Sequence, residues 1–322
     1  ITGITTISAS GYNVTLDTAT NNFANEVRIT GAVVIIVDED AINLGASTVS
    51  GAYSVTAGGA VTNSGALVIP NTTTISAVNG SSVKQDVTLD TATNNFGTLA
   101  ITGANVTARD TDAIVLGAST VSGTYAVTAG GAVTQSGALA ITGATTISAS
   151  GHNVTLNTAT NNFQGAVGIT GANVAVVDAG AIDLGASTVS GTYAVTATAS
   201  GDITNSDVLA ITGGATFKVD DGRSITLNQS NTFSSTVTFT PLSGTIAAVT
   251  IKDSNTLDLK ALTLTGDLNV TAGGAVTNSG TLVIPGTATI SASSQAVTLN
   301  ESSNDFGTAA ITGANVAITD TN

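Results

Sequence analysis

VTLDTATNNF, at residues 14–23, is the stretch that decides the fold, because the chain repeats it. It returns as VTLDTATNNF at 87–96 and VTLNTATNNF at 154–163, and drifts to ITLNQSNTF at 225–233 and VTLNESSNDF at 297–306. The closing phenylalanines are therefore 73, 67, 70 and 73 residues apart. A repeat whose length varies by a few residues predicts a coiled architecture in which each turn packs against its neighbours.

Each repeat is a series of short alternating runs separated by turn residues. In the best-preserved repeat, residues 138–197, Val154 and Leu156 fall on one face of such a run and Thr155 on the other. Gly, Asn, Asp or Ser stands between one run and the next. About nine runs per repeat, taken three to a turn, predict turns of about 23 residues and roughly 14 turns in all. We therefore predict an all-β parallel β-helix (solenoid).

The alternative architecture is a string of β-sandwich domains, one for each repeat. Sandwich domains usually bury a large aromatic residue and are joined by proline-marked linkers. Aromatic residues make up only 3% of this chain, Trp is absent, and only three prolines occur. We therefore expect one continuous segment of about four and a half repeats over residues 1–322. Both ends match interior phrases (1–10 resembles 141–150, and 311–322 resembles 101–112), so we expect a fragment of a longer chain.

Composition excludes several classes of function. The formal net charge is −14 with only 7 Lys plus Arg, which argues against binding to nucleic acid or to anionic membrane surfaces. No run of 18 apolar residues occurs, so no membrane-spanning helix is expected. The chain has no cysteine, which suits an exported protein that avoids misoxidation. Its apolar residues are mainly Val, Ile, Leu and Ala, which predicts a narrow core.

Two long phrases carry a resemblance to a known family. They are GGAVTQSGALAITGATTISASGHNVTLNTATNNF at 130–163 and GANVAVVDAGAIDLGASTVSG at 171–191. Such phrases resemble the repeat regions of filamentous-haemagglutinin-like exoproteins, which are large surface adhesins of Gram-negative bacteria, often exported by two-partner secretion. The resemblance implies a right-handed parallel β-helix and a role in adhesion, aggregation or biofilm building. The chain contains no Arg-Gly-Asp triplet and no segment like the family's secretion domain.

An enzyme is not expected, although β-helices also carry polysaccharide lyases and hydrolases. Such sites need paired carboxylates, or a carboxylate with a cation nearby. The arginines Arg28, Arg109 and Arg223 do not recur between repeats. His152 stands where the first repeat has Tyr12, which indicates a surface substitution. We predict no catalytic residue and no cofactor site.

The polar residues that do recur suggest structural corners. An asparagine precedes each closing phenylalanine by two residues, at Asn21, Asn94, Asn161, Asn231 and Asn304. The residue after each Val-Thr-Leu or Ile-Thr-Leu run is Asp17, Asp90, Asn157, Asn228 or Asn300. Asp and Asn interchange there, so the shared property is a short side chain that accepts a hydrogen bond from the backbone. A ligand contact is the alternative interpretation.

A third set of aspartates raises the question of calcium. Alignment on ITGANV places Asp38, Asp110, Asp178 and Asp320 in one position, with Asp253 as the probable equivalent. Acidic solenoids can bind Ca²⁺ at turns, but calcium needs six to eight oxygens. The position two residues on is Asp40, Asp112, Gly180, Asn255 or Asn322, which share turn preference and not charge. We therefore interpret the set as turn corners and predict no metal site.

Two remaining patterns are weak. Thr72, Thr73 and Thr74 could suggest ice binding, but the repeat length drifts too much for regular ranks of threonine. Asn-x-Ser/Thr triplets at Asn13, Asn71 and Asn153 are expected by chance in such a composition, and glycosylation stays open.

The sequence therefore predicts a structural segment of a fibrous bacterial cell-surface or extracellular-matrix adhesin, acting as a stiff rod or filament. The alternative is a carbohydrate- or receptor-binding β-helix module. Expected partners are further copies, end to end or laterally, and surface glycans of host or bacterium, with no nucleic acid and no membrane insertion. The tyrosines Tyr12, Tyr53, Tyr125 and Tyr193 do not cluster in one insertion, as a sugar-stacking site would require.

Overall fold

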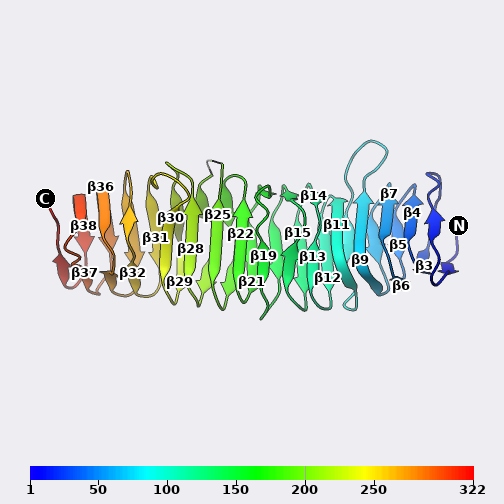
Figure 1. The fold of residues 1–322 in the computed structure, drawn as a ribbon, viewed down its shortest axis with the longest axis horizontal. Coiled ribbons are helices and arrows are strands. Elements are labelled where there is room, and N and C mark those ends of the chain that lie inside the picture. Colours follow the sequence, from blue (N-terminus) through cyan, green and yellow to red (C-terminus); the bar gives the residue numbers. More distant parts are fainter. Residues whose placement is uncertain (200) are drawn as a thin grey trace. The chain divides into compact units, whose positions relative to one another are not determined.

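A computed structural model describes residues 1–199 and 201–322 of the chain. Two compact units are present, Ile1–Gly165 and Ala166–Asn322. Both are built from short strands that pair in parallel, and the described residues contain no helix (Figure 1). No segment of the described residues therefore has the form of a membrane-crossing helix.

The first unit holds strands β1 to β20. Their bounds are β1 Thr5–Ser8, β2 Val14–Leu16, β3 Glu26–Gly31, β4 Val34–Asp38, β5 Ile42–Leu44, β6 Ser47–Val49, β7 Tyr53–Ala57, β8 Val61–Asn63, β9 Leu67–Ala77, β10 Val87–Leu89, β11 Asn95–Gly103, β12 Val106–Asp110, β13 Ile114–Leu116, β14 Ser119–Val121, β15 Tyr125–Ala129, β16 Val133–Gln135, β17 Leu139–Ile141, β18 Thr145–Ser148, β19 Val154–Leu156 and β20 Asn162–Phe163.

The second unit holds strands β21 to β39. Their bounds are β21 Val167–Gly171, β22 Val174–Asp178, β23 Ile182–Leu184, β24 Ser187–Val189, β25 Tyr193–Ala197, β26 Ile203–Asn205, β27 Leu209–Ile211, β28 Ala215–Val219, β29 Ile225–Phe233, β30 Val237–Pro241, β31 Val249–Asp253, β32 Leu257–Leu259, β33 Leu262–Thr263, β34 Leu268–Ala272, β35 Val276–Asn278, β36 Leu282–Ser291, β37 Val297–Leu299, β38 Asp305–Thr312 and β39 Val316–Ile318.

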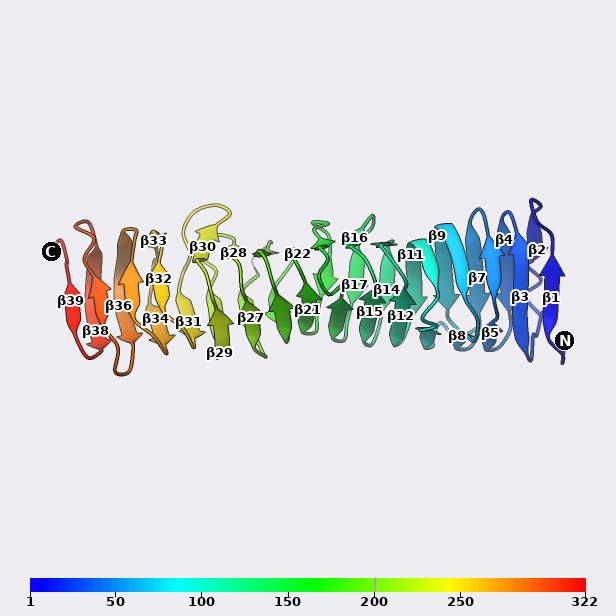
Figure 2. The same cartoon turned by 90° about the horizontal axis from the view of Figure 1, so that it is seen from below.

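Most strands pair with the strand three places along and the others with the strand two places along, so about three strands make one turn of a parallel β-solenoid. In the first unit β12 pairs with β15 and β15 with β18, which places Val106 opposite Tyr125 and Tyr125 opposite Thr145. In the second unit β22 pairs with β25, and β25 with β28. The predicted parallel β-solenoid is confirmed (Figure 2).

The turns are shorter and more numerous than predicted. Paired residues lie 19 positions apart at Val106 and Tyr125, 20 at Tyr125 and Thr145, and 21 at Val133 and Val154. The solenoid accordingly has about 16 turns, where the sequence predicted roughly 14. The reason is that a repeat holds ten runs, because the long strand β11 bends and carries two of them, pairing with β13 and also with β14.

Ten runs at three per turn make three and one-third turns. A phrase that recurs once per repeat therefore falls on a different face of the solenoid in the next repeat. In the first unit the Val-Thr-Leu phrase of β2 pairs with β4, whose next partner is β7. The same phrase in β10 belongs to a different column, with β12 and β15. The repeat phrases therefore spiral around the solenoid, and no outer face carries one phrase in a continuous line.

Inward side chains stack into apolar columns. One column of the second unit runs Ile182, Ile203, Ile225, Val249, Leu268 and Ala288 in register, all of them buried. Large rings are accommodated by small neighbours, since Thr73 stands opposite Tyr53 and Thr145 opposite Tyr125. Each buried aliphatic side chain contributes about 1.5–3 kcal/mol of transfer free energy, which the solenoid gains without a wide core.

Candidate functional site

Of the aspartates aligned on ITGANV, Asp38, Asp110, Asp178 and Asp253 are buried, whereas Asp320 is exposed. Asp110 is only 2% exposed. Its Oδ2 accepts the Phe96 N–H at 2.6 Å and its Oδ1 accepts the Asp112 N–H at 2.9 Å. Asp38 repeats both contacts with Phe23 and Asp40, at 2.8 and 2.9 Å. The carboxylate thus caps its own turn and fixes the closing phenylalanine, whose sequence position lies 14 or 15 residues earlier.

In the second unit the corner at Asp253 is looser than those at Asp38 and Asp110. Asp253 accepts the N–H groups of Phe233 and Asn255 through one oxygen, Oδ1, at 3.1 and 3.2 Å. Its Oδ2 is buried and has no hydrogen-bond partner. Burial raises the pKa of both carboxyls, to about 6 in Asp110, while the two amide contacts oppose the rise.

These carboxylates do not form a ladder. On the next turn the residue opposite Asp38 is Ala57, and the residue opposite Asp110 is Ala129. Asp253 likewise faces Ala272. Within the described residues no group of three or more His, Cys, Asp or Glu side chains could hold a metal ion. The arrangement supplies hydrogen-bond acceptors to the backbone, which is the chemistry of a corner.

The asparagine two residues before each closing phenylalanine links successive turns. Asn94 is fully buried. Its Nδ2 donates to the Leu89 carbonyl at 3.1 Å in its own turn, and its Oδ1 accepts the Leu67 N–H at 3.0 Å from the turn before. Contacts of the same kind occur at Asn161, Asn231 and Asn304. The predicted backbone contact exists, but it joins two turns and does not close one locally.

Sequence reasoning missed the partner of this asparagine. Asn63 donates its Nδ2 to Asn94 Oδ1 at 2.8 Å, and Gln135 does the same to Asn161 at 2.8 Å. Asn205 and Asn278 take the same role toward Asn231 and Asn304. The available signal was the amide that recurs after Val-Thr or Ile-Thr in VTN, VTQ and ITN. Its distance along the chain, 26 to 31 residues, hides the pairing.

A buried serine was missed as well. Ser119, in the phrase GASTVSG, is 3% exposed. Its Oγ accepts the Ile101 N–H at 3.0 Å and donates to the Gly117 carbonyl at 3.0 Å. Ser47 and Ser187 make the equivalent contacts in their own repeats. The repetition of GASTVSG at 45–51, 117–123 and 185–191 was the signal.

Other residues considered from the sequence lie on the outside. Asp17, Asp90, Asn157 and Asn300 are exposed directly after their strands, and Asn228 is exposed within the long strand β29. Asp38 and Asp110 accept the N–H two residues on, as expected of corners, whereas the oxygen of the closing-phrase asparagine accepts an N–H from the turn before.

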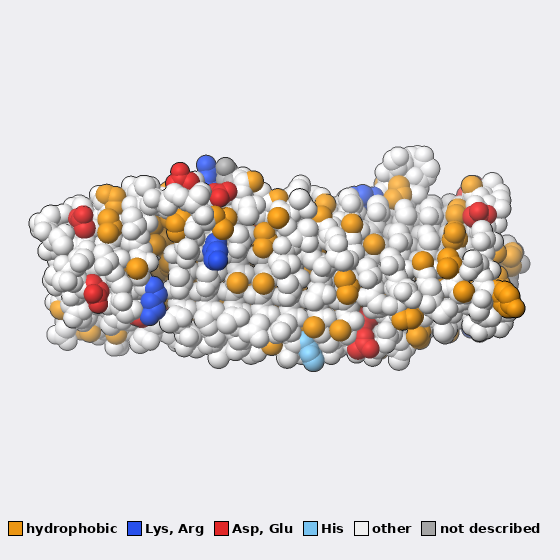
Figure 3. Space-filling view, viewed as in Figure 1, with side chains coloured by type: hydrophobic (Ala, Val, Ile, Leu, Met, Phe, Trp, Pro, Cys, Tyr) orange, Lys and Arg blue, Asp and Glu red, His pale blue; other side chains and the backbone are white. Residues whose placement is uncertain are grey.

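The cationic candidates do not converge. His152 and Arg109 are exposed, and Arg28 pairs with Glu26 at 2.6 Å. The threonines Thr72 and Thr74 are exposed but Thr73 is buried, so the three do not form one outer rank. Charged side chains are scattered over the visible face, most of which consists of backbone and of side chains that are neither charged nor hydrophobic (Figure 3).

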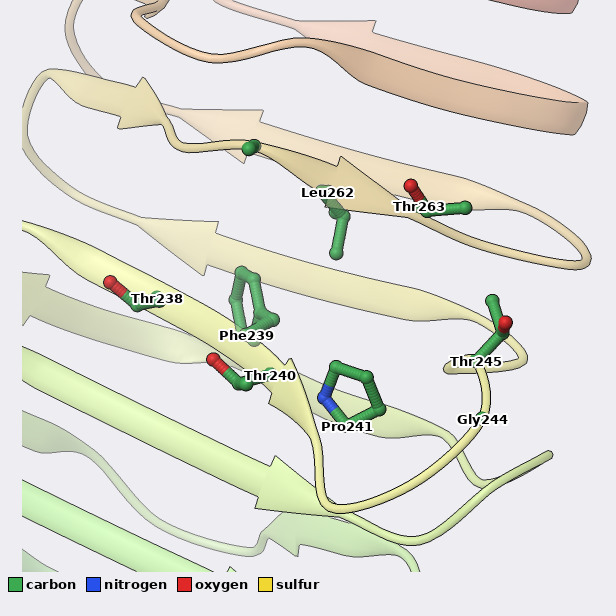
Figure 4. A pocket seen from close by; sticks show the side chains of 9 residues that line it. Thr238, Phe239, Thr240, Pro241, Gly244, Thr245, Leu262 and Thr263 are labelled. Carbon is green, nitrogen blue, oxygen red and sulfur yellow. The ribbon is translucent and has the colours of Figure 1, made fainter.

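The second unit contains a cavity of about 480 Å³ where a turn departs from the pattern. It is lined by Thr238, Phe239, Thr240, Pro241, Gly244, Thr245, Ala261, Leu262 and Thr263. The Phe239 and Leu262 side chains point toward one another across it, and the chain after Pro241 swings away as a loop (Figure 4).

The cavity follows from an insertion. The chain takes 13 residues from Val237 to Val249, where the first unit takes eight from Leu99 to Val106. Ile246 is equivalent to Gly103, because Ile246 bridges to Leu264 in the way that Gly103 pairs with Val121. The five additional residues are therefore Pro241–Thr245.

One family model matches the chain five times in succession, at residues 1–30, 30–102, 103–170, 171–240 and 246–321, and its description is repeats of unknown function (DUF5649). The matched segments leave out residues 241–245, which are the insertion beside the cavity. No curated protein and no solved structure matches the chain.

Proposed function

The chain belongs to the family of repeats of unknown function (DUF5649), and we propose that it is a structural segment of a fibrous bacterial cell-surface or extracellular-matrix adhesin. In this role it acts as a stiff rod or filament in adhesion, aggregation or biofilm building. The resemblance to filamentous-haemagglutinin-like repeats supports this proposal, and a secreted or surface location on a Gram-negative bacterium follows from it.

The observation that carries the proposal is the way each turn is fastened to the next. In the first unit, the buried Asn94 and Asp110 join backbone groups of different turns. Ser119 adds a third such contact. The asparagine contact recurs at Asn161, Asn231 and Asn304, and the serine contact at Ser47 and Ser187, so contacts between turns recur along the chain. Such a chain gains length by adding repeats without needing a new core.

The carbohydrate-binding alternative has less support. Tyr53, Tyr125 and Tyr193 are at most 1% exposed, so their rings cannot stack on a sugar. Burial also raises the pKa of their hydroxyl groups. Tyr12 is 75% exposed but stands alone in its turn.

The test combines shape, resistance and adhesion. Negative-stain images of the purified chain should show slender particles of uniform width, and trypsin or thermolysin should leave them intact for hours. Beads coated with the chain should aggregate or attach to bacterial or epithelial cells above beads coated with albumin. Two compact bodies joined by a cleavable linker would overturn the structural part, and coated beads that behave like the albumin control would overturn the adhesive part.

A further inference from the structure

We propose that Asn79 is a site of spontaneous deamidation, at which the side-chain amide is lost through a cyclic imide and replaced by a carboxylate. The reaction needs only water, and it places a new negative charge on a protruding hairpin of the first unit. The inference is independent of the proposed structural function, because it rests on the chemistry of this hairpin alone.

The hairpin is an enlarged corner of the solenoid. Nine residues, 78–86, separate strands β9 and β10, whereas five residues, 149–153, separate β18 and β19. Val78 bridges to Lys84 in the antiparallel direction, and the segment stands out from the first unit between β9 and β11 (Figure 1). Gly80 is exposed, so water reaches the hairpin where the reaction takes place.

The residue after Asn79 favours the reaction. Deamidation begins when the backbone nitrogen of the next residue attacks the asparagine Cγ, and glycine hinders this close approach least because it has no Cβ. Asn79-Gly80 is the only Asn-Gly pair in the chain. The exposed Asn71 and Asn157 are instead followed by threonine, whose branched side chain is stiff and crowds the backbone.

The hairpin also holds the Asn79 carboxamide as the reaction requires. Asn79 Oδ1 accepts the Ser81 N–H at 3.0 Å and the Val83 N–H at 2.9 Å. Two donors on this oxygen polarise the C=O bond, and they stabilise the negative charge that develops on the oxygen when Cγ is attacked. The Gly80 N–H has no acceptor within the part of the chain that the structure describes, so hydroxide from the solvent can remove its proton.

The step involves no oxidation or reduction. Hydroxide removes the Gly80 amide proton, and the nitrogen forms a bond to Asn79 Cγ. The Cγ–Nδ2 bond then breaks, and the amide nitrogen takes a proton from water and leaves as ammonia. Water opens the resulting five-membered imide at one of its two carbonyls, which gives aspartate or isoaspartate at position 79.

The aspartate product suits the hairpin. A carboxylate oxygen can accept the same two N–H groups that Asn79 Oδ1 accepts now, and the contacts become charge-assisted and stronger. Asp38 and Asp110 already accept the N–H two residues on in this way. Isoaspartate instead routes the main chain through the side chain, which adds an atom to the backbone and disturbs the hairpin.

The direct test is peptide mapping by high-resolution mass spectrometry. The purified full chain is incubated in mildly alkaline buffer made with ¹⁸O-labelled water, so that only carboxylates formed during the incubation carry the label. We expect Asn79 to convert before the other asparagines, and faster than Asn71 by about tenfold or more. Conversion of Asn71 at the same rate as Asn79 would overturn the assignment.

Gly80→Ala is the matched variant. A Cβ at Gly80 meets nothing within 4 Å, and the residue does not have a positive φ, so the variant should fold; a far-UV circular dichroism melt checks this. Its Asn79 should convert more slowly by about tenfold or more. An unchanged rate in the folded variant would contradict attack by the Gly80 nitrogen.

A peptide separates the role of the hairpin from that of the local sequence. Acetyl-AVNGSSVKQ-amide, which covers residues 77–85, contains the same Asn-Gly pair without the fold. Because the hairpin supplies two donors to Oδ1, we expect the folded chain to convert at least as fast as the peptide. An Asn79 that stays intact in the folded chain while the peptide converts would show that the hairpin protects it, and would overturn the proposal.

Discussion

Ser119 in the first unit and Leu262 in the second occupy the same place in their repeats, yet the turns around them differ. Around Ser119 the hydroxyl takes the Ile101 N–H and the two strands pair. Around Leu262 the pairing with the turn before is limited to Val237 opposite Leu259 and Ile246 opposite Leu264, and a cavity of about 480 Å³ lies between the strands. The difference teaches that parallel pairing here depends on matched length between turns and on an acceptor at the corner, more than on strand-forming residues.

Replacing one phenylalanine in each of the two regions should give the largest difference in stability. Phe96 is fully buried, whereas Phe239 is 7% exposed and borders the cavity. We expect Phe96→Ala to lower the free energy of unfolding by about 3–5 kcal/mol and Phe239→Ala to cost less, because its surroundings are already incompletely packed. Urea unfolding followed by circular dichroism measures both. Equal costs would contradict the view that the altered turn is loosely packed.

The buried asparagine of the regular turn gives the next largest effect. Asn94→Ala leaves the Leu67 N–H and the Leu89 carbonyl without their partner in a buried place. The expected loss is about 2–6 kcal/mol, at about 1–3 kcal/mol for each of the two unsatisfied groups. The matched control is Asn95→Ala, whose half-buried side chain donates to Asp112 Oδ2 at 3.0 Å in a solvent-exposed contact. A similar loss in both variants would refute the linking role of Asn94.

Ser119→Ala makes the regular turn resemble the altered one. The Ile101 N–H loses its acceptor, and we expect a loss of about 1–3 kcal/mol. Amide exchange of Ile101 should accelerate toward the rate of Phe239 in hydrogen-exchange mass spectrometry. Ser122→Ala, an exposed change in the same phrase, should leave both quantities unchanged. Unaltered exchange at Ile101 in Ser119→Ala would count against the hydroxyl as the closing contact.

The contribution of the Asp110 corner to the free energy of unfolding should depend on pH. Burial raises the pKa of this carboxyl to about 6, against about 3.9 in an unfolded chain. Between these values the folded chain holds a proton that the unfolded chain releases, so this contribution to stability is present below about pH 4 and is lost as pH rises through about 6. Urea midpoints of the wild type should therefore fall relative to those of Asp110→Asn over this range. Parallel pH profiles would contradict the expectation.

Calcium should have the smallest effect. Asp110 is followed in its column by Ala129, so carboxylates do not accumulate on one side of the first unit. We expect thermal melts in excess chelator and in millimolar Ca²⁺ to coincide. A calcium-dependent rise of more than a few degrees that disappears in Asp110→Asn and Asp112→Asn would restore the metal interpretation.

Local pattern was enough to predict the strands and the parallel solenoid. Alternation such as Val154-Thr155-Leu156 fixes which side chains turn inward, and Gly, Asn and Asp mark the corners, because both depend on neighbours a few residues away. The Asp38 and Asp110 corners were likewise predictable, since each accepts an N–H two residues on. These features belong to the amino-acid sequence by itself.

Only the tertiary structure decided the length of a turn and the contacts between turns. The partner of Asn94 lies 27 residues away at Leu67, and the partner of Ser119 lies 18 residues away at Ile101. Such distances are set by closure of a whole turn, which sums small differences over every corner, so no short pattern specifies them. For the same reason the insertion Pro241–Thr245 looks like an ordinary loop in the sequence, and it opens a cavity only because the turns on either side hold their register.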